Sequence, residues 1–216
     1  IDDLGYGDLG SFGCTDIPTP HMDSLAANGV KCTFSYITNP PCSPSRCSLL
    51  TGMYAQRFGK SGMARGLPIP KDHPTLAEFM KDAGYVTGMI GKWHLGSDPA
   101  GFDEWEILPG QGDYFNPVLY TATGEKRYDG RYVTDVLTDL AIGFLEKRPA
   151  GKPFFLMWHH KAPHRNWEPD EAHRRQFENR WIPEPPTFWD TYATRTDALR
   201  ENRQRIDRDL TNRDLK

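Results

Sequence analysis

The chain has 216 residues, enough for one domain with a sizeable core, and its formal net charge is −3 with acids and bases mixed throughout. No basic face stands out, so we do not expect nucleic acid as the main partner. No apolar run is long enough to span a membrane as a helix. The four cysteines match no zinc-binding spacing and leave the cellular compartment open.

The chain opens on a glycine-rich acidic run that contains Asp2 and Asp3. Adjacent carboxylates repel each other unless a cation holds them, and hard oxygen ligands of this kind suit Ca²⁺ or Mg²⁺. The alternative is a solvated acidic loop, because short motifs mislead easily. A buried strand is expected directly before two carboxylates of a site. None precedes Asp2, so we expect the chain to be part of a longer protein.

Helical and strand-like segments alternate along the chain, which predicts a parallel α/β sheet. Apolar periodicity predicts helices at residues 20–27, 75–83 and 132–147. Apolar runs predict buried strands at 85–90 and 153–158, and residues 30–37 are also strand-like. The aromatic side chains of residues 101–116 either stack on sugar rings or close this loop on itself.

The segment around Cys42 combines features of an anion site. Residues 39–41 are Asn-Pro-Pro and cannot be helical, so Ser43 is predicted to cap a helix whose first residue is Pro44. Cys42 then lies just before a helix N-terminus, which favours an anion. Arg46, one turn into the helix, can hold a tetrahedral oxyanion with two hydrogen bonds. The alternative is a buried cysteine at an ordinary turn.

Two further polar segments directly follow predicted strands, and in open α/β sheets sites form at the carboxyl ends of strands. The first contains Lys92, which can donate to an anionic oxygen, and His94, which can move a proton near neutral pH. A surface lysine and a packed histidine are the alternative. The second, residues 159–164, holds three histidines and one lysine, which suggest either an anion site or a transition-metal site.

The run C-S-P-S-R-x-x-x-x-T-G that begins at Cys42 resembles the signature of the type I sulfatases, and the resemblance extends from Asp2 to about Trp189. It implies the α/β fold of the alkaline-phosphatase-like superfamily, a sandwich with a mostly parallel central sheet flanked by helices. In that family a maturation enzyme oxidises the cysteine to formylglycine, whose hydrate is the nucleophile.

Carried over position by position, the resemblance implies a set of site residues. The catalytic ones are Cys42, Arg46, Lys92, His94 and His164. The Ca²⁺ ligands are Asp2, Asp3 and the modified Cys42, and Lys161 is a substrate contact. Because a thiolate is a soft ligand, a calcium site beside Cys42 makes chemical sense only if this cysteine is oxidised. The family usually has a second proline two residues after the histidine at 164, whereas here the next proline is Pro169.

The reaction that the resemblance implies is hydrolysis of a sulfate ester on a carbohydrate. In it, His164 protonates the departing alcohol and His94 takes a proton from the hydrate. Residues 109–114 and 161–169 resemble most the sulfatases that act on N-acetylglucosamine 6-sulfate in mucin or glycosaminoglycan, which implies a secreted, periplasmic or lysosomal protein. The alternatives are a phosphodiesterase or phosphonate hydrolase of the same superfamily, and a non-catalytic glycan-binding module.

We expect residues 1–216 to be the N-terminal part of a catalytic domain, truncated at both ends, with a polar connector from about residue 190 to 216. A helix at 199–210 is less favoured than this solvated connector. Ca²⁺ takes six to eight oxygen ligands. After His164 the chain has no apolar strand that ends, as in the family, in Asp followed by Asn, Gln or His and then Gly. We therefore expect the fragment alone to be inactive.

Overall fold

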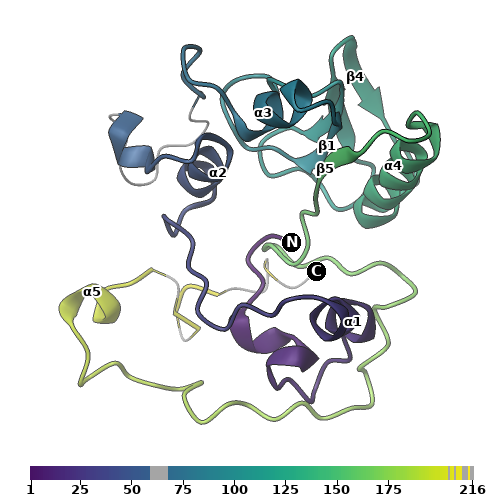
Figure 1. The fold of residues 1–216 in the computed structure, drawn as a ribbon. Coiled ribbons are helices and arrows are strands. Elements are labelled where there is room, and N and C mark those ends of the chain that lie inside the picture. The colour runs from purple at the N-terminus through teal and green to yellow at the C-terminus, as the bar shows by residue number, and fades with distance from the viewer. Residues whose placement is uncertain (59–67, 204, 207, 211–213, 215–216) are drawn as a thin grey trace. The chain divides into compact units, whose positions relative to one another are not determined.

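The computed structural model describes residues 1–58, 68–203, 205–206, 208–210 and 214 (Figure 1). The chain divides into two compact units. The first comprises Ile1–Asp2 and Val30–Lys161, and the second comprises Asp3–Gly29 and Ala162–Lys216. Among the described residues, no helix is long and apolar enough to cross a membrane.

The first unit is built on a five-stranded sheet. Its strands are β1 (Val86–Lys92), β2 (Glu104–Leu108), β3 (Val118–Thr121), β4 (Gly124–Arg127) and β5 (Phe154–His159), in the spatial order β4-β3-β2-β1-β5. β1 runs parallel to both β2 and β5, while β2, β3 and β4 form an antiparallel meander. The expected mostly parallel centre is therefore confirmed. Since β1 and β5 are parallel, the polar segments that follow them emerge at the same edge of the sheet.

Helices cover both faces of this sheet. They are α2 (Cys42–Thr51), α3 (Leu76–Asp82) and α4 (Val133–Lys147), with a short 3₁₀ helix η3 (Ala55–Phe58) after α2. Successive side chains of a strand point to opposite faces. On β1, Met89 packs in the core cluster that includes Ala77 of α3, whereas Gly88 faces Phe144 of α4. The two helices therefore cover opposite faces of the sheet.

The helix boundaries follow from local chemistry. α3 begins after Thr75 because Thr75 and Glu78 form a reciprocal capping box, in which each side chain accepts a hydrogen bond from the other residue's backbone N–H. α4 buries one apolar stripe, which consists of Val133, Val136, Leu137, Ala141 and Phe144. Both helices were predicted from the sequence, and their observed ends differ from the expected ones by at most one residue.

The second unit contains α1 (Pro20–Asn28), α5 (Asp197–Arg200) and two 3₁₀ helices, η1 (Tyr6–Asp8) and η2 (Gly10–Phe12). The carboxylate of Asp23 joins α1 to η2, because it accepts hydrogen bonds from the backbone N–H of Ser11 at 2.6 Å and the hydroxyl of Thr19 at 3.0 Å. These bonds, the one from Ser11 first, lower the pKa of Asp23.

The structure differs from the sequence analysis in three places. Residues 30–37 form no strand, and the side chains of Val30, Phe34 and Tyr36 are exposed. The aromatic-rich loop contains β2, and the hairpin β3–β4 follows it. A four-residue helix, α5 (Asp197–Arg200), overlaps the start of the 199–210 segment, for which a solvated connector was favoured over a helix. Part of the predicted connector, residues 204, 207, 211–213 and 215–216, lies outside the described residues.

Candidate active site

The half-buried Cys42 is the first residue of α2. Pro41, which has extended backbone angles, takes the N-cap position, so the prediction that Ser43 caps the helix is wrong. Pro44 is the third helical residue instead of the first. It is tolerated there because the first N–H groups of a helix have no intrahelical acceptor. Cys42 still lies at the positive end of the helix dipole, as expected.

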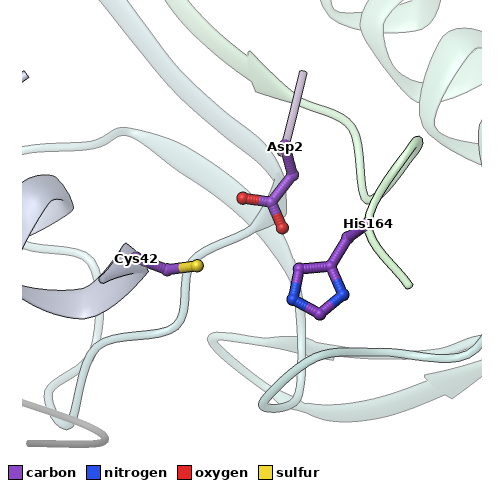
Figure 2. A group of neighbouring side chains, drawn as sticks. All are labelled: Asp2, Cys42 and His164. Carbon is purple, nitrogen blue, oxygen red and sulfur yellow. The ribbon is translucent and has the colours of Figure 1, made fainter. Parts of the chain in front are cut away.

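A buried charge cluster lies beside Cys42 in the first unit. Asp2 is 6% exposed, and its carboxylate forms ion pairs with Lys92 Nζ and, at 3.3 Å, with Arg46 Nη2. Lys92 Nζ is also 3.9 Å from the sulfur of Cys42. A carboxylate oxygen of Asp2 and the sulfur of Cys42 lie within 4.8 Å of each other, and Figure 2 shows the two groups directed toward one another. The structure thus brings together four of the predicted site residues.

Lys92 is the last residue of β1 and is fully buried. The sequence analysis placed it in the loop after the strand. The observed strand is longer because the parallel register continues to the pair of Lys92 with Leu108 of β2. A buried ammonium group requires a charged or hydrogen-bonding partner. Asp2 provides that partner for Lys92.

The guanidinium of Arg46 is held from several sides. Its Nη1 donates to the backbone carbonyl of Lys92 and lies 3.0 Å from Nδ1 of His159, the last residue of β5. Burial and, secondarily, the charge of Arg46 lower the pKa of His159 to about 4. The imidazole is therefore neutral at neutral pH. The sequence analysis noted His159 within a histidine cluster but assigned it no role, because nothing in the sequence places it beside Arg46.

His94 follows β1 with a backbone φ of +57°. This left-handed conformation is uncommon for residues other than glycine and recurs at functional sites. The hydroxyl of Ser43 donates to the carbonyl of His94 at 2.7 Å, and Ser43 is only 3% exposed. The first turn of α2 is thereby connected to the loop after β1, and both carry predicted catalytic residues.

Lys161 was predicted to contact the substrate. Its side chain is 5% exposed, its Nζ donates to the carbonyl of Gln111 at 3.2 Å, and it lies over the ring of Tyr114 at 4.7 Å. These contacts connect the end of β5 to the loop between β2 and β3. A direct contact of Lys161 with substrate remains a prediction.

Two of the three histidines in residues 159–164, His159 and His160, make contacts other than with a metal site. His159 faces Arg46, whereas the ring of His160 packs against Trp158 with ring centroids 4.5 Å apart. Burial is the main cause that lowers the pKa of His160 to about 4. Within the part of the chain that the structure describes, neither histidine belongs to a group of three side chains that could hold a metal ion.

The second unit contains the remaining predicted site residues, Asp3 and His164, and brings their side chains together. Asp3 Oδ2 lies 3.5 Å from His164 Nε2, and His164 Nδ1 lies close to the carbonyl of Arg165. His164 is also labelled in Figure 2. Asp3 has a φ of +60° and an exposed side chain. The adjacent aspartates are therefore in different settings, since Asp2 is buried among cations and Asp3 faces a histidine.

Comparison with protein families decides the identity of the chain, because the sulfatase family model matches residues 1–214. The chain belongs to the sulfatase family. It is 42% identical over 214 residues to the N-acetylglucosamine-6-O-sulfatase of Bacteroides thetaiotaomicron, covering 98% of this chain and 38% of that protein. It is 34% identical over 199 residues to human N-acetylgalactosamine-6-sulfatase, covering 76% of this chain and 38% of that protein.

Solved structures share the fold. One, described as a complex with its substrate D-glucosamine-2-N,6-O-disulfate, superposes with a TM-score of 0.93 at 42% identity, covering all of this chain and 44% of that one. A second, a complex with a neocarrahexaose, has a TM-score of 0.76 at 29% identity and covers 84% of this chain and 48% of that one. This sulfatase chain thus spans less than half of the length of these relatives.

Formylglycine and Ca²⁺ are general features of sulfatases. The chemical type of the donor atoms beside Cys42 is compatible with both. The Asp2 carboxylate is a hard oxygen donor of the kind that Ca²⁺ prefers, and one of its oxygens lies within 4.8 Å of the Cys42 sulfur. The thiol of Cys42 is a poor ligand for a hard cation, whereas an oxygen at the same position is a good one. The donor set therefore suits Ca²⁺ only after oxidation of Cys42.

Replacing Ser43 with alanine tests the connection between α2 and the His94 loop. Loss of a buried hydrogen bond should lower the free energy of unfolding by about 1–2 kcal/mol. Chemical denaturation of the variant measures this loss. Ser24→Ala is the control, because Ser24 donates to the carbonyl of His21 on an exposed helix face and its loss should cost under about 0.5 kcal/mol. Equal losses in the two variants would show that the Ser43 bond has no special structural role.

Proposed function

We propose that the full-length protein hydrolyses sulfate esters of carbohydrates and that its nucleophile derives from Cys42. The observation that carries this proposal is the position of the Cys42 sulfur, at the start of α2 and 3.9 Å from a fully buried lysine ammonium. A helix N-terminus and a desolvated cation both favour an anion at this point. Membership of the sulfatase family supports sulfate as that anion.

The residues around Cys42 have distinct proposed roles. Formylglycine at position 42 supplies a hydrated aldehyde as the nucleophile. Lys92 and Arg46 are already oriented by Asp2, so they can stabilise charge on the sulfate without reorganisation. When bound by Asp2, Asp3 and the oxidised residue 42, Ca²⁺ supplies further positive charge.

Two histidines are proposed to move protons. His164 protonates the departing alcohol, and His94 takes a proton from the hydrate. The contact of His164 Nε2 with the Asp3 carboxylate at 3.5 Å supports the first role, because it holds the imidazole in a defined orientation. The left-handed backbone of His94 supports the second, since strained residues cluster at functional sites.

We propose an amino sugar sulfated at O6 as the substrate, with N-acetylglucosamine 6-sulfate favoured. The relative named N-acetylglucosamine-6-O-sulfatase matches 98% of the chain, whereas two relatives named for N-acetylgalactosamine 6-sulfate match 46% and 76% of it. The partners proposed are a sulfated carbohydrate and a formylglycine-generating maturation enzyme. Family resemblance supports a secreted, periplasmic or lysosomal location.

The test is hydrolysis by the full-length protein, produced together with a maturation enzyme. We expect turnover of an aryl sulfate to exceed that of the matching aryl phosphodiester, and 6-sulfated N-acetylglucosamine to be the best of a panel of sulfated monosaccharides. Faster hydrolysis of the phosphodiester would favour the phosphodiesterase alternative. Binding of sulfated glycans without turnover would favour a non-catalytic module, and preference for another sugar would refute the substrate assignment alone.

A further inference from the structure

Three acceptors from three different segments hold the guanidinium of Arg46. Its Nη1 donates to the carbonyl of Lys92 and contacts Nδ1 of His159, and its Nη2 donates to Asp2. These contacts use three of the five N–H groups that arginine carries. Two of the acceptors, Asp2 and the Lys92 carbonyl, belong to residues already assigned to the site. His159 is the third and has no assigned role.

The chemistry of arginine determines the state of the His159 ring. Arginine has only donors, so the atom that faces its Nη1 at 3.0 Å must be an acceptor. A proton on Nδ1 would point two N–H groups at each other. The carbonyl of Lys92 also lies 3.3 Å from this Nδ1, but a ring nitrogen without a proton cannot donate to it. The ring is therefore the neutral form with its proton on Nε2.

We propose that His159 is a positioning residue that fixes the plane of the Arg46 guanidinium for binding sulfate. A planar guanidinium binds a tetrahedral oxyanion with two parallel hydrogen bonds, and this geometry requires that the plane of the guanidinium is fixed. The Lys92 carbonyl holds Nη1 of Arg46, and the Asp2 carboxylate holds its Nη2. With only these two contacts, the guanidinium could still rotate about the line that joins them. The contact with Nδ1 of His159, from β5, limits this rotation. This inference rests on the proposed function.

Asparagine and leucine have nearly the same shape, so replacing His159 with each of them distinguishes the effect of the lost hydrogen-bond acceptor from the effect of the lost side-chain volume. In His159→Asn, Oδ1 stands two bonds from Cβ, as Nδ1 does in histidine, and it can accept from Arg46. In His159→Leu, a methyl group takes that position and cannot accept. We expect the leucine variant to lose roughly 10- to 100-fold in kcat/KM for an aryl sulfate, and the asparagine variant to stay within about threefold of the wild type.

Two further measurements on the full-length protein do not depend on turnover. Calorimetric binding of inorganic sulfate should weaken in the leucine variant and be retained in the asparagine variant. Nitrogen NMR of the histidine rings should show an unprotonated Nδ1 at His159. If the wild type hydrolyses no sulfate ester, the proposed function fails, and these two measurements still decide the role of His159. A protonated Nδ1, equal losses in both variants, or an unchanged leucine variant would overturn the proposal.

Discussion

Full-length protein that carries Cys42→Ala is expected to lose sulfate-ester hydrolysis by at least about a thousandfold while remaining folded, as is typical when a nucleophile is removed. Cys42 is half-buried at the first residue of α2, so loss of its side chain should change the free energy of unfolding by less than about 1 kcal/mol. The loss of activity would then come from chemistry and not from the fold.

The same helix provides a matched control for this substitution. Cys47 is fully buried, and burial raises the pKa of its thiol, which makes it unreactive. Cys47→Ala leaves a small cavity and should cost roughly 1–2 kcal/mol of stability, with hydrolysis retained. The two variants should therefore show opposite patterns when turnover and denaturation are measured side by side.

Peptide mass spectrometry completes this experiment. In the active wild type, the peptide that contains Cys42 should carry an aldehyde in place of the thiol, and the Cys47 thiol should be intact. A fully active preparation with an unmodified Cys42 thiol would contradict the proposed nucleophile. So would an active Cys42→Ala variant.

Local sequence signals predicted the elements whose ends depend on local chemistry. The helices that apolar periodicity predicted at 75–83 and 132–147 are observed as α3 and α4, with ends within one residue of the expected ones. β4 escaped prediction because all four of its residues are exposed, so no apolar pattern marks it. Its position depends on backbone pairing with β3, and such pairing is invisible in a single segment.

In the candidate site too, local features could be predicted from the sequence and long-range contacts could not. The sequence predicted Arg46 one turn into a helix that begins just after Cys42, and because the observed helix begins at Cys42, the two residues lie one turn apart on one face. It does not show that Asp2 pairs with a lysine 90 positions away, because long-range pairs depend on the tertiary fold. The position of His159 beside Arg46, instead of in a metal site, depends on the parallel register of β1 and β5.

Substitution of Gly91 by alanine is the second change with a large expected effect. Gly91 pairs with His159 where β1 and β5 end, and its φ is +100°, a conformation that residues with a Cβ rarely adopt. A Cβ at this position would lie 2.0 Å from the carbonyl oxygen of His159. That oxygen belongs to the backbone, so the two strands would have to separate to accommodate the methyl group.

The separation would affect stability and the site together. The positive φ costs about 1–2 kcal/mol and overpacking adds about 1–3 kcal/mol, so we expect unfolding to become easier by roughly 3 kcal/mol. Because Lys92 and His159 stand at the displaced strand ends, kcat should also fall by about tenfold or more. Denaturation and kinetics of the full-length Gly91→Ala variant measure both effects.

Gly84→Ala is the control. It separates the cost of a positive φ from the cost of the steric clash between the two strands. Gly84 has a φ of +88°, but a Cβ there meets no atom within 4 Å. This variant should therefore show only the conformational cost of about 1–2 kcal/mol, with an unchanged kcat. If the two variants lose the same stability, the contact with the His159 carbonyl is unimportant. If Gly91→Ala loses stability but keeps its kcat, the junction of β1 and β5 supports the fold without positioning Lys92 and Arg46.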